Sequence, residues 1–334
     1  MTTPAMTLAR VFLALLTLAA LAMNGAAASP LAPAEVTVGT YVNNVQDVTF
    51  KDGHLTMDFY VWFRWKADGR LAKYKPLDSL ELINGEIDNK GSVVEKELQD
   101  GNRYASARIT ATIYKTWEIA LFPFDKHKVD VHLEDSKFDA RQLMFVADDK
   151  NSHLGDEVAL AGWTFHGFTI AAAPKAYKTN YGVIGPKEDA GSTYSRVKFS
   201  IEMRREGTGP AVKLLTTVCI ATLVAFVAFG IRPTDVDPRF GLGVGSLFAV
   251  AASAFIVAST VPDTAVLTIA DRVHILAMWF IFASLVQSAF CLKWDEAGRD
   301  LLYRCVDAWS LVLFPLAFGL ATLWITSSAW RAQP

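Results

Sequence analysis

Side chains that could carry out catalysis or hold a metal are few and scattered in this chain of 334 residues. Its three cysteines, Cys219, Cys291 and Cys305, lie in or beside apolar C-terminal segments and form no CxxC pair. The six histidines lack metal-ligand spacing, and the sequence contains no P-loop, nucleophile elbow or glycine-rich dinucleotide fingerprint. We therefore expect neither an enzyme nor a bound cofactor.

Charge and hydrophobicity favour a membrane environment over a nucleic-acid partner. The 32 Lys and Arg residues nearly balance the 34 Asp and Glu residues, which leaves a formal net charge of −2 and no basic excess for binding nucleic acid. Hydrophobic residues make up 52% of the chain, which is high for a purely soluble protein. We therefore expect a membrane portion.

Residues 1–28 have the pattern of a secretory signal peptide. A short segment ending in Arg10 precedes an apolar run from Val11 to Met23 and the small residues Ala26 to Ala28. Because a membrane span needs about 20 apolar residues, this pattern predicts a cleaved signal, the alternative being a short N-terminal anchor. The mature chain, from about Ser29, then begins outside the cytoplasm.

Residues 29–206 have the pattern of an all-β domain. Between His54 and Trp65 hydrophobic residues occupy every second position, which predicts a half-buried strand. Turn signals such as Lys51-Asp52-Gly53, Asn84-Gly85 and Gly185-Pro186 recur along the segment. Many short strands separated by such turns predict an immunoglobulin-like β-sandwich outside the membrane.

Residues 207–334 contain four long apolar runs, which predict a four-helix transmembrane bundle. The first and third connections between the runs hold lysine and arginine residues, and the second holds none. Under the positive-inside rule, the C-terminus then lies on the same side as the β-domain. The runs extend from Ala211 to Ile231, from Phe240 to Val261, from Thr268 to Leu292 and from Leu301 to Trp324.

The segment Phe122-Pro123-Phe124-Asp125 stands in the β region ahead of the four spans. It resembles the F-P-F-D signature of the pentameric ligand-gated ion channels, the Cys-loop receptor superfamily, where this loop sits on the membrane domain. Animal members have a pair of cysteines around this signature, at about the positions of Lys115 and Val129. No disulfide can form here, which is similar to the bacterial branch of the family.

Three further segments share the resemblance, which covers nearly the whole mature chain. Trp65 followed by Arg70-Leu71 looks like the W-x-D-x-R-L segment with one extra residue. Leu160 to Trp163 resembles the strand after the signature, and Arg204-Arg205 resembles the basic residue before the first span. The resemblance implies a homopentameric, ligand-gated ion channel in the bacterial inner membrane, with membrane lipid, inorganic ions and a small-molecule agonist as its partners.

The second apolar run is uncharged and rich in small residues after Asp237-Pro238-Arg239. Proline is favourable at a helix start, so Pro238 marks the cytoplasmic end. Spacing alone favours packing of one face against lipid or a neighbouring helix, whereas the resemblance implies that this face lines a pore. Helical spacing gathers on this face Asp237, Gly241, Gly245, Phe248, Ala252 and Phe255.

Two features of this face bear on conduction. Rings of Phe248 and Phe255 would form hydrophobic constrictions that stop ions by dewetting. A ring of Asp237 carboxylates at the mouth would attract cations, although Pro238-Arg239 resembles the Pro-Ala-Arg stretch of anion-selective members. We expect cation selectivity on balance.

The resemblance also implies a ligand site between subunits, where aromatic rings surround a cationic group. The segment from Pro174 to Ser195 is predicted to be a flexible loop that caps this site. Ordinary strand packing is the competing explanation, above all for the two residues of the early strand. The matching positions are Tyr60, Trp62, Phe138, Tyr177, Tyr181 and Tyr194.

For gating, the resemblance implies that the loop Phe122-Pro123-Phe124-Asp125 acts on the connection Val261-Pro262. Asp125 and Arg204 are expected to form an ionic contact at the boundary, for which a purely structural salt bridge is an equal alternative. Two other functions stay open. One is a sensor of the same architecture that does not conduct, and the other is a channel opened by protons through His127, His132 and acidic residues.

Overall fold

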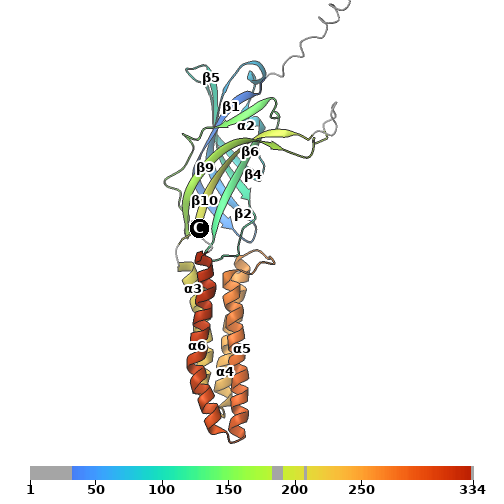
Figure 1. Ribbon diagram of the computed structural model, residues 1–334. Coiled ribbons are helices and arrows are strands. Elements are labelled where there is room, and N and C mark those ends of the chain that lie inside the picture. The colour runs from blue at the N-terminus through green and yellow to red at the C-terminus, as the bar shows by residue number, and fades with distance from the viewer. Residues whose placement is uncertain (1–31, 183–190, 207–208, 332–334) are drawn as a thin grey trace, which may run out of the picture.

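The computed structural model describes residues 32–182, 191–206 and 209–331. It places a β-domain of two sheets on a bundle of four long helices, with β9 and β10 descending to the top of α3 (Figure 1). This arrangement confirms the expected β-sandwich followed by a four-helix bundle. The predicted signal peptide, residues 1–28, lies outside the described residues.

The larger sheet contains the alternating strand predicted from the sequence at its centre. Its order is β4-β5-β2-β1-β7, with the short β8 pairing with β1. The turn between β1 and β2 places Gly53 at φ +67°, a conformation that favours glycine. The strands are β1 (Ala34–Thr49), β2 (His54–Lys66), β4 (Gly85–Glu97), β5 (Asn102–Tyr114), β7 (Leu143–Ala147) and β8 (His153–Leu154).

The smaller sheet has the order β3-β6-β10-β9 and ends in the long β9–β10 hairpin. The helical turns η1 (Gly69–Leu71) and α2 (Pro76–Ser79) connect the two sheets through β3. The strands are β3 (Leu80–Leu82), β6 (Lys126–Asp135), β9 (Trp163–Ala176) and β10 (Thr193–Arg205).

The two sheets bury one hydrophobic face each against the other. Along β2 every second side chain from Leu55 to Trp65 is buried, as the period of two requires. Phe59 of β2 meets Phe199 of β10 edge to face, with ring centroids 5.2 Å apart. Burial of these aromatic and aliphatic side chains stabilises the sandwich without any disulfide, because its described strands hold no cysteine.

Four helices of membrane-spanning length follow the β-domain. The third begins with a capping box in which Thr268 and Asp271 each satisfy the other's backbone N–H. Phenylalanine rings of α3, η2, α5 and α6 form the centre of the bundle. The elements are α3 (Gly209–Phe226) continued by η2 (Val227–Gly230), α4 (Val236–Thr260), α5 (Ile269–Glu296) and α6 (Asp300–Arg331).

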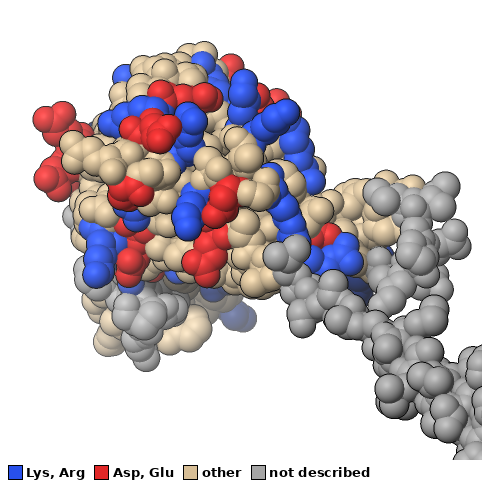
Figure 2. Space-filling model, turned by 90° about the horizontal axis from the view of Figure 1, so that it is seen from above, with Lys and Arg blue, Asp and Glu red and all other residues tan. Residues whose placement is uncertain are grey.

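The far end of the β-domain has a mixed surface. Seen from above, blue Lys and Arg side chains alternate with red Asp and Glu side chains (Figure 2). Among the described residues on this face, the two signs of charge are interspersed.

Candidate functional site

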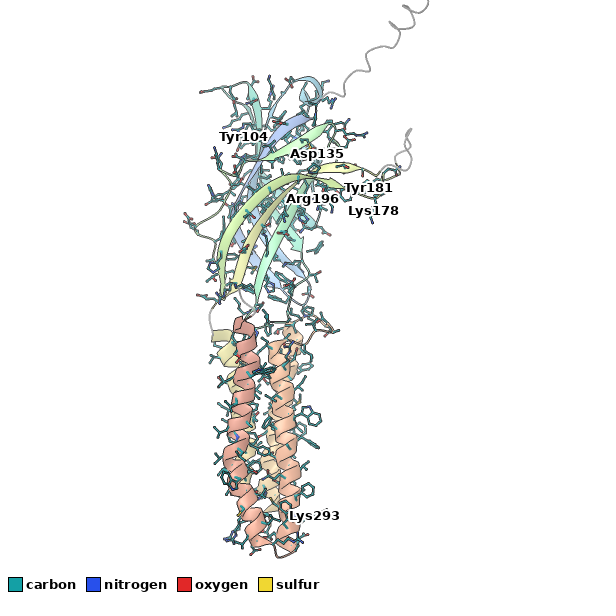
Figure 3. All side chains as sticks on the ribbon, in the orientation of Figure 1. Tyr104, Asp135, Lys178, Tyr181, Arg196 and Lys293 are labelled. Carbon is teal, nitrogen blue, oxygen red and sulfur yellow. The ribbon has the colours of Figure 1, made fainter. Side chains whose placement is uncertain are left out.

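Three tyrosines gather at the tip of the β9–β10 hairpin. Tyr177, Tyr181 and Tyr194 have ring centroids between 5.8 and 6.2 Å apart, each pair in edge-to-face geometry. Tyr181 is 59% exposed and stands at the outer end of the hairpin (Figure 3). The structure thus brings together the three tyrosines that the sequence singled out in this segment, in a group we call the tyrosine cluster.

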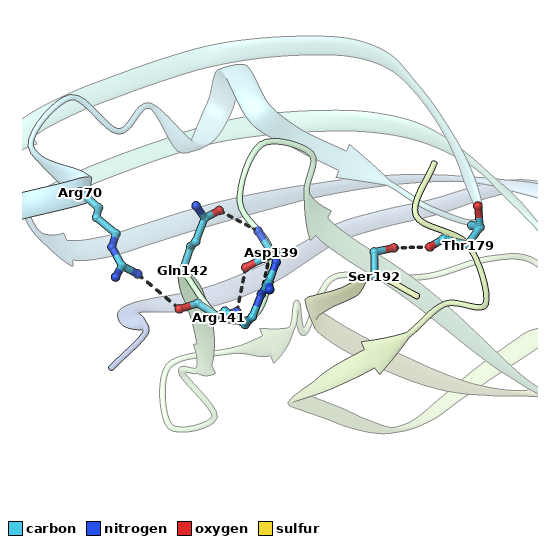
Figure 4. A network of polar contacts seen from close by, with 6 residues as sticks. All are labelled: Arg70, Asp139, Arg141, Gln142, Thr179 and Ser192. Carbon is cyan, nitrogen blue, oxygen red and sulfur yellow. Dashed lines mark hydrogen bonds and ion pairs between the residues drawn. The ribbon is translucent and has the colours of Figure 1, made fainter. Parts of the chain in front are cut away.

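Backbone and side-chain hydrogen bonds hold the two sides of the β9–β10 hairpin together next to the tyrosine cluster. Tyr177 N–H donates to the carbonyl of Ser192, and the Ser192 hydroxyl donates to the carbonyl of Thr179 at 2.8 Å (Figure 4). These bonds hold Tyr177 close to Tyr194 although many residues separate them in the sequence.

A buried ion pair lies behind the tyrosine cluster. Arg196 donates to Glu134 across the β10–β6 register at 2.6 Å, and their side chains are 15% and 4% exposed. The Tyr177 hydroxyl donates to Glu134 at 2.8 Å and accepts from Arg196 at 2.7 Å. Burial and the Glu134 carboxylate raise the pKa of Tyr177 to about 12. The sequence analysis missed this pair, because only the register of β6 against β10 sets Glu134 opposite Arg196.

Carboxylates lie around the cluster, together with the guanidinium of Arg196, which is 5.9 Å from the Tyr177 ring centroid. The pKa of Tyr194 is raised by burial, by Tyr181, and by the carboxylates of Asp139, Glu134 and Glu81. Asp139 is held in place by the N–H and guanidinium of Arg141, whose carbonyl accepts from Arg70 (Figure 4). The faces of aromatic rings such as these attract cations.

Phe138 belongs to the turn that follows β6. Its described ring contact is with Tyr74, at 5.6 Å. The Asp135 carboxylate fixes this turn by accepting from the Phe138 N–H, from Ser79 and from the Tyr74 hydroxyl. Phe138 is therefore half-buried, with its contacts directed toward the interior of the domain.

Tyr60 and Trp62 lie on the outer face of β2, in the other sheet. The Trp62 indole donates to Asp148 at 3.1 Å and covers Gly39, where an added Cβ would come within 2.3 Å of the ring. Within one chain the structure does not bring Tyr60 or Trp62 to the tyrosine cluster, because the two groups occupy different sheets.

The expected ion pair at the domain junction is made by Arg205 and not by Arg204. Arg205 donates to Asp125 at 2.9 and 3.2 Å, and His127 lies 2.6 Å from the same carboxylate. Side chains of a strand alternate between its two faces. Arg205 therefore lies on the inward face with Met203, whereas Arg204 points to the exposed outer face.

Aromatic rings enclose this ionic group. The Arg205 guanidinium lies 4.4 Å from the Trp163 ring and 5.1 Å from the rings of Phe50 and Phe122. Burial alone would raise the pKa of Asp125, but hydrogen bonds from His127 and Arg205 outweigh it and hold the pKa below its ordinary value. Asp125 is therefore ionised and firmly placed at the base of the β-domain.

The loop Phe122-Pro123-Phe124-Asp125 contacts the first turn of α5. The Ala270 N–H donates to the carbonyl of Phe122 at 3.3 Å. Val257, Val261 and Ala270 belong to the same hydrophobic core as Phe122 and the sandwich strands. The packing of the β-domain thus continues without interruption into the end of α4 and the start of α5.

The turn between β1 and β2 faces the α4–α5 connection across a cavity. Lys51, Asp52 and Gly53 share the wall of a cavity of about 470 Å³ with Pro262 and Thr264. The sequence analysis had assigned the contact with Pro262 to the Phe122 loop alone. The structure adds the β1–β2 turn, whose closeness to residues two hundred positions away has no signal in a single sequence.

Helix α4 presents two distinct faces. Gly243, Ser246, Val250, Ser253 and Val257 are buried against the other helices. Phe248 and Phe255 are 73% and 76% exposed, so no described residue of the same chain covers them. The exposed face contains every member of the predicted set, Asp237, Gly241, Gly245, Phe248, Ala252 and Phe255.

Arg239 does not share that exposed face. Its side chain is 0% exposed and forms a two-pronged ion pair with Asp307 of α6, at 2.6 and 2.9 Å. Arg239 also donates to the carbonyl of Ile231, while Gln287 and Cys291 of α5 donate to Asp307. The sequence analysis missed Asp307, because nothing in one sequence gives the rotation of α6 relative to α4.

The chain is similar in sequence to known channel and receptor subunits. No protein-family model matches the chain. The chain is 20% identical over 297 residues to the gamma-aminobutyric acid receptor subunit theta of Mus musculus, covering 82% of this chain and 44% of that subunit. The chain is related to the Cys-loop family of pentameric ligand-gated channels.

Two further relatives agree with this relationship. The glycine receptor subunit beta of Rattus norvegicus is 24% identical over 191 residues, covering 57% of this chain and 37% of that subunit. The pH-sensitive chloride channel 2 of Anopheles gambiae is 23% identical over 198 residues, covering 57% and 31%. The chain spans less than half the length of each of these three proteins.

The relationship and the four spans make this chain a multi-pass membrane protein. Its three cysteines are free and lie in the helices. Lys115 and Val129 stand near the positions that the family's paired cysteines occupy, so the loop between them carries no disulfide. The Asp125–Arg205 ion pair and its aromatic surroundings fasten this loop instead.

Proposed function

We propose that this chain is the subunit of a homopentameric ligand-gated ion channel. The observation that carries the proposal is the shared core at the domain junction, where Val257 and Val261 of α4 pack with the sandwich. Because packed cores resist continuous deformation, a rearrangement of the sandwich must displace the end of α4. This packing supports mechanical coupling between a ligand on the β-domain and the exposed face of α4.

The ligand we propose is a small cationic amine at the tyrosine cluster. The exposed ring of Tyr181 and the half-buried ring of Tyr194 offer faces to a cation, and the carboxylates of Asp139, Glu134 and Glu81 lie near Tyr194. In a ring of subunits, Tyr60 and Trp62 would reach this site from the neighbouring copy, which accounts for their separation within one chain. Phe138 would line its inner wall.

Ligand binding would favour one of two arrangements of the junction. Closure of the β9–β10 hairpin over the ligand would move β10 and the Arg205–Asp125 pair at its lower end. The Phe122 loop and the β1–β2 turn would then displace α5 and the Pro262 connection. Opening follows only if the ligand binds the open arrangement more tightly.

The pore we propose is lined by the exposed face of α4 and selects cations. Phe248 and Phe255 would form two hydrophobic rings, and Asp237 an acidic ring at the mouth. Withdrawal of Arg239 into its pair with Asp307 removes the competing positive charge from this face. Selectivity would therefore differ from that of the relative named as a chloride channel.

The orientation we propose has the β-domain and the C-terminus outside the cytoplasm of a bacterium, in its inner membrane. Lysine and arginine residues in the α3–α4 and α5–α6 connections, with none in the α4–α5 connection, support it.

Electrical recording tests the proposal. The full chain is expressed in oocytes, and current is recorded during application of primary amines. Phe248→Ala is expected to shift the amine concentration for half-maximal current several-fold, because it removes a hydrophobic ring. The matched control Phe282→Ala, an exposed phenylalanine of α5, should leave the current unchanged. Absence of current from an assembled pentamer would instead favour a sensor that does not conduct.

Protons are a second candidate stimulus, favoured by two observations. His127 is buried between Asp125 and the aromatic rings at the junction, and one relative is named a pH-sensitive chloride channel. His132 lies beside Arg196, and burial followed by that guanidinium lowers its pKa. A pH step in the absence of amine would produce current only if protons open the channel.

A further inference from the structure

A cationic cavity lies at the lower end of the β-domain, outside the tyrosine cluster and the pore face. Its volume is about 560 Å³. Four cationic side chains line it against two carboxylates, and they come from the segment after β5, the start of β6 and the end of β10. These six residues are Lys115, Lys126, Lys128, Arg204, Glu118 and Glu202.

Strand register explains why the charges converge. Lys126 stands opposite Arg204 and Lys128 opposite Glu202 in the antiparallel β6–β10 pair, so these side chains share the outer face of the sheet. Lys128 is only loosely paired with Glu202, at 4.0 Å, with its side chain 49% exposed. The register thus brings cationic side chains of both strands to one wall of the cavity.

Lys115 adds a charge that is partly removed from water. It stands between β5 and the Phe122 loop, with its ammonium 5.5 Å from the Trp117 ring centroid. Burial lowers its pKa, against the opposing effect of Asp130 and Glu118. An anion in the cavity would restore favourable surroundings to this ammonium.

The cavity lies at the end of the β-domain that is next to the membrane spans. Arg204 is separated from the start of α3, Gly209, by only a few residues, and α3 is a membrane span. The lower ends of β6, β9 and β10 reach the top of the helix bundle (Figure 1). The anions most concentrated at this level are the phosphates of the adjoining leaflet.

We propose that this cavity binds the phosphate of an anionic phospholipid headgroup. Lysine and arginine side chains on separate strands suit the several oxygens of a phosphate group, which accept charge-assisted hydrogen bonds from more than one direction. The bound headgroup would bridge β6 and β10 beside the Asp125–Arg205 pair. The site is independent of the tyrosine cluster, so it does not require that the chain conducts.

The test titrates purified full-length chain in neutral detergent with short-chain phosphatidylglycerol or phosphatidylcholine and follows thermal unfolding. The wild type should bind phosphatidylglycerol more tightly than phosphatidylcholine. Lys115→Gln with Lys128→Gln should weaken phosphatidylglycerol binding about fivefold for each lysine. Lys198→Gln is the matched control, since Lys198 is 44% exposed and is paired with Asp130 at 3.7 Å on the same sheet, outside the cavity.

A gain-of-binding variant guards against misfolding of the double variant. Glu202→Gln removes a carboxylate from the cavity and releases Lys128, so phosphatidylglycerol should bind several-fold more tightly. Unchanged or weaker binding to this variant would overturn the proposal, as would full binding to the double variant or an equal loss in Lys198→Gln. Equal stabilisation by inorganic phosphate at the same concentration would overturn the lipid assignment in favour of a free anion.

Discussion

Replacement of Asp307 by asparagine tests what the buried pair between α4 and α6 contributes. The change removes the negative charge and one of the two acceptors that receive Arg239 at 2.6 and 2.9 Å. Arg239 then keeps one amide oxygen and the carbonyl of Ile231, while its Nε already lacks a partner within the described residues. A guanidinium with 0% exposure cannot turn to water without opening the bundle.

The expected loss is about 3 kcal/mol, the lower end of the range for breaking one side of a buried pair. For a chain of this size that corresponds to a fall in Tm of roughly 6–12 °C. The assay is thermal unfolding of the full chain in one detergent, followed by tryptophan fluorescence. Asp300→Asn serves as the control, because Asp300 is exposed at the first turn of the same helix.

A double variant separates pairing from burial. Arg239→Met with Asp307→Leu removes both charges at similar volume, so most of the lost stability should return. The reasoning would be refuted if Asp307→Asn melted within about 2 °C of the wild type, or if the double variant were as unstable as the single one.

Three further predictions concern the β-domain. The pKa of Asp125 in the folded protein lies below its ordinary value of 3.8. The stability that Asp125 contributes is therefore present above pH 3.8 and is lost as the pH falls through the folded pKa. Asp125→Asn should flatten the acid side of a curve of Tm against pH. Tyr177→Phe removes a donor to Glu134 and should lower stability by about 1–2 kcal/mol in urea unfolding. Gly39→Ala should displace Trp62 and change its fluorescence, with a loss of about 1–3 kcal/mol.

Each of these three predictions has a control variant or an outcome that would contradict it. Asp125→Asn should be compared with Asp52→Asn, an exposed carboxylate of the nearby turn, and parallel curves for Asp125→Asn and wild type would contradict the pKa argument. Tyr114→Phe removes an exposed tyrosine–carboxylate bond and should cost less than Tyr177→Phe. Unchanged tryptophan fluorescence in Gly39→Ala would contradict the expected displacement of Trp62, because it would mean that the strand backbone moves and the Trp62 ring stays.

Periodicity was enough to predict the fold. Alternation along His54–Trp65 and four apolar runs of membrane length correspond to β2 and to the four long helices of the structure. Both signals are local, because burial of one face repeats every two or every 3.6 residues. Even Arg205 was within reach of this reasoning, since it follows Phe199, Ile201 and Met203 at every second position of β10.

Contacts across long sequence distances were beyond prediction. Glu134–Arg196 depends on the register of β6 against β10, and Arg239–Asp307 depends on how two helices rotate about their axes. Neither quantity leaves a pattern in one sequence. The cationic cavity was missed for the same reason, since Lys115, Lys128 and Arg204 are separated in the chain and meet only through strand pairing.

The core shared between the sandwich and the helices imposes an order on biosynthesis. Phe122 and the lower sandwich residues leave the ribosome well before Val257, Val261 and Ala270, which complete the same hydrophobic cluster. Until the second and third spans have packed against it, the β-domain has an unfinished apolar base. A β-domain produced without its spans would expose that base and self-associate through it.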